Sequence, residues 1–191
     1  RTQDLKFAGG HTRVEIGDGT TIREYVTINA STADGGVTRV GNRCLLMAYA
    51  HVAHDCVLGD EVIMANCGTL AGHVVVEAQA VIGGLSGVHQ FVRIGRMAMI
   101  GGCSKVTQDV PPFMIADGHP LQVHGVNAVG LKRRGVAPAS RRALKDCFRL
   151  FYRRGLSHHQ ALEEIEQNVE QVPEVKDLSV VVKEAVRGIA G

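Results

Sequence analysis

Histidines near the middle of the chain, with an aspartate and a glycine, are the residue types that acyl-group chemistry requires. His54 is followed directly by Asp55, and further histidines stand at positions 51, 73 and 89. A neutral imidazole can remove a proton from an attacking hydroxyl, and a backbone N–H can stabilise the oxyanion that forms. A lone histidine is more often structural than catalytic, so this chemistry depends on whether the fold brings these residues together.

An aliphatic residue recurs at every sixth position between Ile16 and Val106, and the residue two positions before it is usually small. A period of six fits neither an α-helix nor a coiled coil, and it is typical of the hexapeptide repeats of a parallel β-helix. The series is interrupted once, at residues 34–39, which we expect to form a degenerate side or an outward loop. A Gly-Gly pair there favours the loop. Residues 1–15 are predicted to be an entering loop, and the strand pattern to end at Pro111.

Stacking predicts which side chains meet on the outside of adjacent coils. Three repeats make one coil of 18 residues, so residues i and i+18 should lie about 4.8 Å apart in parallel strands. By this count Gly72 lies over His54, and His73 lies over Asp55. We therefore predict His54 as a general base, the Gly72 N–H as oxyanion donor, and Asp55 or another nearby acceptor as the group that holds the His54 tautomer. No serine or cysteine is clearly paired with His54, which favours direct transfer over a covalent intermediate.

The same histidines allow other interpretations. His51, His73 and His89 also leave the core by the hexapeptide count. Zinc needs three or four convergent ligands, and His54 and His73 are one residue out of stack, so we do not expect a metal site. A zinc hydratase on the same fold and a non-catalytic scaffold remain as alternatives.

Composition limits the possible classes of protein. The 191 residues suit one domain with an appendage, and 45% hydrophobic with only 4% aromatic residues suits a core of stacked aliphatic side chains. A net charge of +2 argues against a nucleic-acid binder, and no apolar run approaches the ~20 residues of a membrane span. Cys44 and Cys56 occupy inward positions and are predicted to be buried free thiols in a reducing compartment. The chain starts at Arg1 without Met or a signal sequence, so we interpret it as part of a longer protein.

The period changes beyond about residue 137. Helices are predicted from Pro138 to Arg154, from a capping box at Ser157 to about Val169, and from Pro173 onward. The third should bury the stripe Val175, Leu178, Val181, Val182 and Val186. Three short helices in a row indicate a small helical cap or bundle.

The densest basic cluster lies between the repeat and these helices. Arg133 and Arg134 follow Lys132 and are framed by Gly130 and Gly135. A basic run is usually a solvated surface. Paired guanidinium groups that follow a turn out of the solenoid nevertheless match the oxygens of a diphosphate.

Six segments together resemble one known family. They are A-H-V-A-H-D-C (50–56), L-A-G-H (70–73), G-V-H-Q-F-V-R-I-G (87–95), G-G-C-S (101–104), Q-D-V-P-P (108–112) and G-V-N-A-V-G-L-K-R-R-G (125–135). Over essentially its whole length the chain is similar to the UDP-N-acetylglucosamine O-acyltransferases of lipid A biosynthesis. A hexapeptide repeat is common to many acyltransferases, whereas the last segment and V-H-Q-F are specific.

The resemblance implies a fold that is mainly β with an α-helical tail, namely a left-handed parallel β-helix of hexapeptide repeats followed by a small C-terminal three-helix domain. Relatives have further coils before Arg1, so residues 1–120 are expected to form an N-terminally truncated β-helical acyltransferase domain. Residues 121–191 then form the helical domain with a nucleotide-binding segment. The resemblance also implies a homotrimer with active sites in clefts between neighbouring subunits.

The implied reaction moves an (R)-3-hydroxyacyl chain from acyl carrier protein to the 3-hydroxyl of UDP-N-acetylglucosamine. It is the first step of lipid A biosynthesis and takes place in the cytoplasm, without a cofactor. His54 matches the general base and Gly72 the oxyanion donor. Residues that match substrate contacts or line the same cleft are Asp4, Lys6, His51, His73, His89, Gln90, Asn127, Arg133 and Arg134. Gly102 matches the position that limits acyl length, where a glycine leaves room for a longer chain.

Three positions depart from the family pattern. Val129 stands where well-known members have an acidic residue, and Asn29 and Pro120 stand where members have histidine. These differences concern the contacts with the nucleotide and the length of the acyl chain, and not the chemistry. Another hexapeptide acyl- or acetyltransferase that uses coenzyme A is the alternative reaction. Candidates for receiving the acidic carrier protein are the basic residues Arg93, Arg96 and Lys105.

Overall fold

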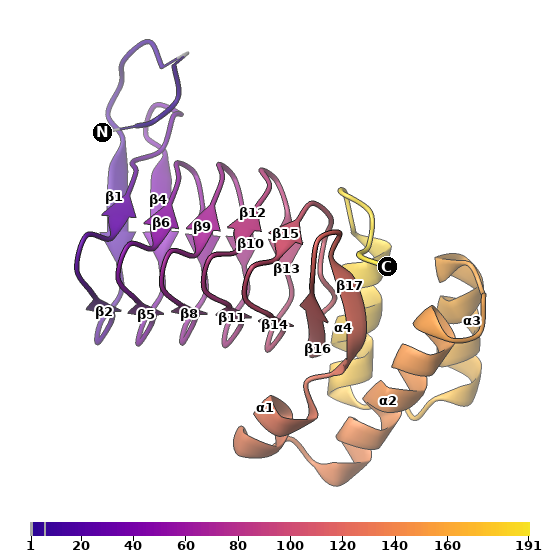
Figure 1. The fold of residues 1–191 in the computed structure, drawn as a ribbon. Coiled ribbons are helices and arrows are strands. Elements are labelled where there is room, and N and C mark those ends of the chain that lie inside the picture. Colours follow the sequence, from indigo (N-terminus) through magenta and orange to yellow (C-terminus); the bar gives the residue numbers. More distant parts are fainter. Residues whose placement is uncertain (1, 6) are drawn as a thin grey trace.

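A three-sided solenoid of short parallel strands forms the first part of the protein. The computed structural model describes residues 2–5 and 7–191. Its strands fall into three sheets, each running along one face of the solenoid, and the chain visits the three faces in turn (Figure 1). Each hexapeptide therefore makes one side of a triangular coil, and the predicted parallel β-helix is confirmed.

Each face contains every third strand. The first face consists of β1 (Arg13–Ile16), β4 (Val37–Val40), β7 (Val57–Leu58), β10 (Val75–Val76) and β13 (Arg93–Ile94). The second consists of β2 (Thr21–Ile22), β5 (Leu45–Leu46), β8 (Ile63–Met64), β11 (Val81–Ile82), β14 (Met99–Ile100), β16 (Met114–Asp117) and β17 (Gln122–Val126). The third consists of β3 (Thr27–Ile28), β6 (His51–Val52), β9 (Thr69–Leu70), β12 (Gly87–Val88) and β15 (Lys105–Val106).

The stacking interval is the predicted one over most of the solenoid. Val57 pairs with Val75, 18 residues further on, in parallel strands of the first face. The first coil is longer, because Thr27 pairs with His51, 24 residues further on. The additional residues form an outward loop before β4, as the Gly-Gly pair predicted. The strand resumes at Val37, which lies inside the stretch expected to be irregular.

Inward side chains of the repeat form a stacked aliphatic column. Leu58, Leu70 and Ile82 are at most 1% exposed. Cys44 and Cys56 are buried free thiols, as predicted. Each buried aliphatic side chain contributes about 1.5–3 kcal/mol, so this column is the main favourable term in the stability of the solenoid.

The first coil is the open end of that column. Ile16 is 47% exposed and Ile22 is 43% exposed, because each has a stacking neighbour on one side only. The entering segment is shorter than predicted, since β1 already begins at Arg13 and pairs with β4. The coil is thus held by its backbone ladder more than by its side chains.

Every corner of the triangle requires a residue in the left-handed region of backbone space. Positive φ angles recur at every sixth position from Arg43 (50°) to Cys103 (57°), and Asp55 and His73 both have φ of 61°. For a non-glycine residue this conformation costs about 1 kcal/mol or more, which the ladder hydrogen bonds and the column offset. The repeat therefore dictates how the backbone turns at the positions of Asp55 and His73.

An antiparallel pair closes the C-terminal end of the solenoid. β16 pairs in parallel with β14 and antiparallel with β17, and a bulge separates Ile115 from Ala116. The boundary expected between residues 120 and 121 lies in the turn that joins β16 to β17. The strand β17 therefore extends the sheet of the second face before the helices begin.

Four helices follow in the described residues, and not the expected three. They are α1 (Ala128–Arg133), α2 (Pro138–Tyr152), α3 (His158–Asn168) and α4 (Pro173–Lys183). The six residues of α1 are too few to show a helical period, and the Asn127 side chain caps its start by accepting from the Gly130 N–H at 3.0 Å. The three longer helices are confirmed, including the capping box of Ser157 and Gln160.

The longer helices pack together beside the closed end of the solenoid (Figure 1). Leu144 of α2, Ile165 of α3 and Leu178 of α4 are at most 1% exposed. The stripe predicted for α4 extends too far, since Val186 is 88% exposed beyond the end of the helix at Lys183. Among the described residues, the helices fall short of the length and apolar character that crossing a membrane requires.

Replacing an inward side chain should destabilise the solenoid far more than replacing its outward neighbour. Ile100 is 0% exposed, whereas Met99, beside it in β14, is 39% exposed. We expect Ile100→Ala to lower the free energy of unfolding by about 2–5 kcal/mol, because it leaves a cavity in the column. Met99→Ala should cost less than about 1 kcal/mol. Urea denaturation measures both, and equal losses would contradict the inward assignment.

Candidate active site

Polar residues of three consecutive coils meet at the edge between the third and first faces. We call this edge the histidine corner and define it as residues 53–56, 71–74 and 89–92. The His73 N–H donates to the His54 carbonyl at 3.0 Å. One coil further on, the Phe91 N–H donates to the Gly72 carbonyl at 3.2 Å. His54, Gly72 and Gln90 therefore occupy equivalent positions in successive coils, as the 18-residue count predicts.

The imidazole of His54 is oriented by its neighbour in the sequence. Nδ1 of His54 lies 2.8 Å from Oδ2 of Asp55, and the two side chains are only 17% and 13% exposed. An ionised carboxylate only accepts hydrogen bonds, so Nδ1 donates, and in the neutral ring Nε2 holds the lone pair. Nε2 is therefore the atom that can take a proton from a bound molecule.

The Asp55 carboxylate is held by the loop that lengthens the first coil. The Ser31 and Thr32 hydroxyls donate to it, the latter at 2.7 Å, and the Thr32 N–H donates at 3.1 Å. The Thr38 hydroxyl accepts the Asp55 N–H at 2.8 Å. Burial raises the pKa of Asp55, but the hydrogen bonds from these hydroxyls and from His54 outweigh burial and hold the pKa well below its usual range. Asp55 is therefore ionised at neutral pH.

Gly72 leaves open the space that the His54 ring occupies. A Cβ at this position would lie 2.5 Å from Cε1 and 2.6 Å from Nε2 of His54, closer than real side chains approach. The Gly72 carbonyl accepts from Phe91, whereas its N–H has no hydrogen-bond acceptor among the described residues. A free backbone donor is thus available next to His54.

Three neighbours orient the ring of His73. It stacks on Phe91 with centroids 4.8 Å apart and 15° between the planes. It meets the ring of His54 in a T-shaped contact at 5.1 Å, and its Nε2 lies 3.7 Å from Oδ2 of Asp55. His73 is therefore held in a defined orientation although its side chain is 39% exposed.

A pocket of about 330 Å³ opens beside His54 and Gly72. The rest of its lining is formed by Gln3, His51, Ala53, Thr69, Leu70 and Ala71. Nδ1 of His51 lies 2.7 Å from the Thr27 hydroxyl, and Nε2 lies 3.0 Å from Oε1 of Gln3. Burial lowers the pKa of His51, so this ring is mostly neutral at pH 7. The pocket thus combines an aliphatic wall with imidazole groups, which suits a polar molecule with a reactive hydroxyl.

The histidine corner also contains three possible metal ligands. Ligand atoms of His54, Asp55 and His73 lie within 4.8 Å of one another, so the expectation that they do not converge is wrong. They converge because the same Asp55 oxygen lies 2.8 Å from Nδ1 of His54 and 3.7 Å from Nε2 of His73. The Asp55 oxygens already accept hydrogen bonds from two hydroxyls and from His54, and a metal ion would have to displace those bonds.

The remaining predicted residues near this edge differ in their surroundings. His89 and Gln90 are exposed members of the histidine corner, one coil beyond Gly72. Asp4 lines a separate pocket of about 390 Å³ in the entering segment. Lys6 lies outside the described residues.

Gly102 lies at another corner of the solenoid. Residues 101–104 connect the second face to the third, and a Cβ at Gly102 would lie 3.3 Å from the Gly84 carbonyl oxygen. The structure of one chain therefore does not bring Gly102 to the side chain of His54.

The predicted nucleotide-binding residues lie near the third corner, between the first and second faces. The Asn127 side chain donates to the Met97 carbonyl at 3.0 Å, in addition to capping α1. Arg134 forms an ion pair with Glu61. Arg133 lines a pocket of about 590 Å³ together with Ala128, Val129, Lys132 and Arg141. In a single chain these residues, like Gly102, lie at a different corner from the histidines.

Two of the basic residues considered for a carrier protein already have acidic partners. Arg93 forms ion pairs with Glu77 and Glu184, and Arg96 forms one with Asp177 at 3.0 Å. The ion pairs with Asp177 and Glu184 connect the solenoid to α4 and its C-terminal end. To bind an acidic surface of the carrier protein, Arg93 and Arg96 would have to give up their ion pairs with these acidic residues.

Among the site residues that sequence analysis missed are Ser31, Thr32 and Phe91. Phe91 had a signal, because it stands 18 residues after His73, the same interval that pairs His54 with Gly72. The two hydroxyl residues had none, because the longer first coil breaks that interval between β3 and β6. Only the folded loop shows that they reach the carboxylate.

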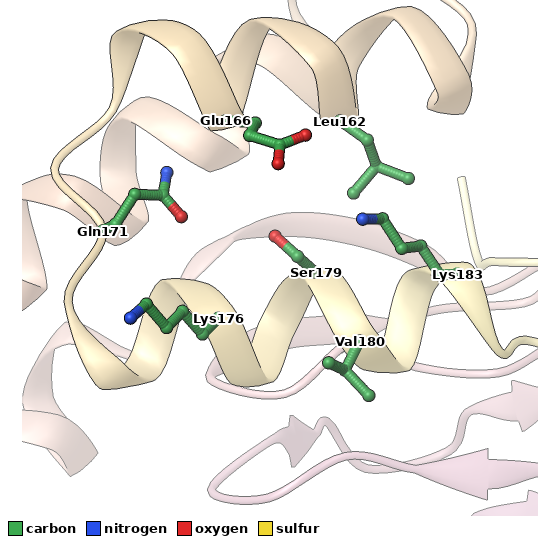
Figure 2. A pocket seen from close by; sticks show the side chains of 7 residues that line it. All are labelled: Leu162, Glu166, Gln171, Lys176, Ser179, Val180 and Lys183. Carbon is green, nitrogen blue, oxygen red and sulfur yellow. The ribbon is translucent and has the colours of Figure 1, made fainter.

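A second concavity lies away from the histidines, between α3 and α4. Figure 2 shows Leu162 and Glu166 on one helix, facing residues of the other across a space of about 270 Å³. Its other lining residues are Gln171, Lys176, Ser179, Val180 and Lys183. The lining contains neither histidine nor cysteine, so it lacks the proton-transfer groups of the histidine corner.

Two known families and several curated proteins match this chain. Residues 109–190 match the family described as UDP-N-acetylglucosamine O-acyltransferase, domain 2, and residues 38–72 match the bacterial transferase hexapeptide repeats. The acyl-[acyl-carrier-protein]–UDP-N-acetylglucosamine O-acyltransferase of a Synechocystis strain is 56% identical over 85% of this chain and 59% of its own length. The enzyme of the same name from Alkalilimnicola ehrlichii is 47% identical over 98% of this chain and 73% of its own length.

Solved structures are similar across the whole chain. LpxA from Acinetobacter baumannii superposes with a TM-score of 0.95 at 37% identity, covering 100% of this chain and 74% of that protein. LpxA from Bacteroides fragilis, a UDP-N-acetylglucosamine acyltransferase, superposes with a TM-score of 0.97 at 38% identity and the same coverage. The chain spans 59% of the length of the first two curated relatives that it matches. Identity and coverage together show that this chain belongs to the UDP-N-acetylglucosamine O-acyltransferase family.

Proposed function

We propose that the protein transfers an (R)-3-hydroxyacyl chain from acyl carrier protein to the 3-hydroxyl of UDP-N-acetylglucosamine, in lipid A biosynthesis, with His54 as general base. The observation that carries this proposal is the pairing of His54 with Gly72. The ring is oriented through Nδ1 by an ionised carboxylate, and it packs against Gly72, whose backbone N–H has no acceptor among the described residues. The names of the relatives supply the substrates.

The proposed reaction is a direct transfer. His54 Nε2 removes the proton of the sugar 3-hydroxyl as its oxygen attacks the thioester carbonyl carbon. The Gly72 N–H stabilises the oxyanion of the tetrahedral intermediate, and Asp55 stabilises the imidazolium. The intermediate collapses by breaking the C–S bond, and the departing thiolate of the carrier takes the proton from His54. The ester and the free thiol are then the products.

Cys56, the cysteine of the histidine corner, is a poor candidate for a covalent intermediate. Cys56 is 0% exposed, and its Sγ donates to the Ala71 carbonyl at 3.1 Å. Burial raises the pKa of Cys56 to about 12, so the thiol is protonated at neutral pH. This supports a transfer in which no enzyme nucleophile takes part.

We further propose a homotrimer, in which neighbouring subunits complete each site. His54, Gly102 and Arg134 lie at three different corners of one solenoid. Packing one edge of each chain against a different edge of the next would bring residues of different corners into one cleft. The contacts of Gly102 with the acyl chain and of Asn127, Arg133 and Arg134 with the nucleotide are proposed for that cleft.

A panel of acyl donors tests the reaction itself. Full-length protein is assayed with UDP-N-acetylglucosamine and with 3-hydroxyacyl carrier proteins of graded length, in parallel with the matching coenzyme A thioesters. We expect transfer from the carrier protein at a kcat/KM well above that for coenzyme A. Preference for the coenzyme A donors would instead identify a different hexapeptide acyltransferase, and stoichiometric zinc in the active protein would favour the hydratase.

Removing the proposed general base should nearly abolish turnover. We expect His54→Ala to lower kcat by at least ~10²-fold, because proton removal from the attacking hydroxyl is lost. His159→Ala is the matched control, since His159 is an exposed residue of α3 whose side chain is 83% accessible. Steady-state rates of the two variants decide the matter. Near-normal turnover by a well-folded His54 variant would refute the proposed role.

Stability should depend on the ionisation of Asp55. Because the pKa of this carboxyl is lowered in the folded protein, ionisation stabilises the fold above the unfolded pKa near ~4, and this contribution is lost as pH falls below it. We expect Asp55→Asn to lower the free energy of unfolding by about 2 kcal/mol at pH 7, with a difference that shrinks below pH ~4. Asp146→Asn, which removes one surface ion pair, is the control. Urea denaturation from pH 3 to 8 measures both, and a pH-independent loss would contradict the assignment.

Filling the space at Gly102 should change the preferred acyl length. We expect Gly102→Met to favour shorter chains, because its side chain would occupy the proposed cleft. Gly125→Met serves as the control, since a Cβ at Gly125 meets no atom within 4 Å. The readout is kcat/KM across donors of graded length. If both variants keep the wild-type preference, chain length is set elsewhere, for example near Pro120.

A further inference from the structure

The segment that follows α4 folds back onto the last coils, where one buried carboxylate holds it (Figure 1). Asp109 is 2% exposed. Its Oδ2 accepts the N–H groups of Val186 and Arg187 at 3.1 and 3.2 Å. The backbone of Asp109 donates to the Gly188 carbonyl at 2.8 Å and accepts from the Ala190 N–H at 2.9 Å. The C-terminal segment therefore has a defined position beside the solenoid.

This position brings the side chain of Arg187 to the histidine corner. Nη2 of Arg187 lies 3.2 Å from Nδ1 of His89, although 98 residues separate the two in the sequence. A guanidinium group only donates, so Nδ1 accepts, and the neutral His89 ring then carries its proton on Nε2. The same Nδ1 lies 3.3 Å from the Gln90 carbonyl, a contact that would need a proton on Nδ1. The contact with Arg187 therefore favours the tautomer of His89 that carries its proton on Nε2.

The positive charge of Arg187 has no acidic partner within the described part of the chain. Its side chain contacts His89, which is not an anion in this arrangement. The neighbouring Arg93 is already paired with Glu77 and Glu184, and the Asp109 carboxylate is taken up by backbone N–H groups. Most of the N–H donors of an exposed guanidinium group are thus free at the edge of the candidate site.

Arg187 lies at the same edge as the proposed general base. Gln90, next to His89, is equivalent to His54 two coils further along the histidine corner. Two strand spacings amount to about 10 Å, which is within the length of an extended substrate that reaches His54. Both proposed substrates carry a phosphate group at some distance from the reacting atoms. The nucleotide sugar has its diphosphate, and a carrier protein has the phosphodiester of its phosphopantetheine arm.

We propose that Arg187 is a further substrate-binding residue, which contacts a phosphate oxygen of a molecule bound along the histidine corner. The inference rests on the proposed function. A guanidinium group matches phosphate oxygens in geometry and charge, and Asp109 fixes the backbone from which it extends. His89 keeps the guanidinium at this edge while leaving its charge uncompensated.

The test compares Arg187→Gln and Arg187→Lys with Arg154→Gln in the full-length protein. Arg154 is an exposed arginine beyond the end of α2 and is the matched control. KM is measured separately for UDP-N-acetylglucosamine and for the 3-hydroxyacyl carrier protein, at low and high salt. We expect Arg187→Gln to raise one KM about 10-fold, with kcat within ~2-fold of wild type and a weaker salt dependence, and Arg187→Lys to restore part of the loss.

Each outcome decides a separate point. A higher KM for the nucleotide sugar assigns Arg187 to the diphosphate, and a higher KM for the carrier assigns it to the phosphodiester. If neither KM rises above that of the Arg154 variant, or if only kcat falls, the inference is overturned. Absence of transfer by the wild-type protein would overturn the proposed function. Calorimetric titration with UDP-N-acetylglucosamine and with the carrier protein would then still decide on Arg187, because equal affinities in wild type and variant would reject its role.

Discussion

Backbone hydrogen bonds between parallel strands, whose paired residues stand 18 apart in the sequence, are the constraint on which the rest of this protein depends. They hold each coil at one strand spacing from the next, so a residue type that recurs with this interval forms a line along the outside of the solenoid. The aliphatic column supplies the stability, and the corners carry the polar groups. His54 and Gly72 meet because the ladder sets their separation, and a Cβ at Gly72 would lie 2.5 Å from the ring.

The first coil departs from this interval, and the departure builds part of the site. Its additional residues place Ser31 and Thr32 against the Asp55 carboxylate, which is only 13% exposed. A buried carboxylate is unfavourable unless hydrogen bonds compensate, and here they lower its pKa instead of raising it. The ionised group in turn determines which nitrogen of His54 is free. An irregularity in the repeat thereby orients a side chain in the next coil.

The proposed site residues are distributed over the three corners of the solenoid. The histidines share one corner, Gly102 lies at the second, and Arg134 lies near the third, where it pairs with Glu61. A single rigid solenoid cannot bring its own corners together. This separation is the physical reason for proposing an assembly in which edges of different chains form each cleft. The C-terminal segment of the same chain also reaches the histidine corner. Asp109 anchors this segment, and its Arg187 contacts His89.

The amino-acid sequence alone determined the parallel β-helix, its stacking interval, the pairing of His54 with Gly72, and the three longer helices. These features follow from local periods, which a regular backbone ladder converts directly into positions in space. Only the tertiary structure decided that Ser31 and Thr32 hold Asp55, that Asn127 donates to the Met97 carbonyl, and that Arg187 reaches His89. Each of these contacts joins residues across a loop or a chain end, where no period connects positions in the sequence to positions in the fold.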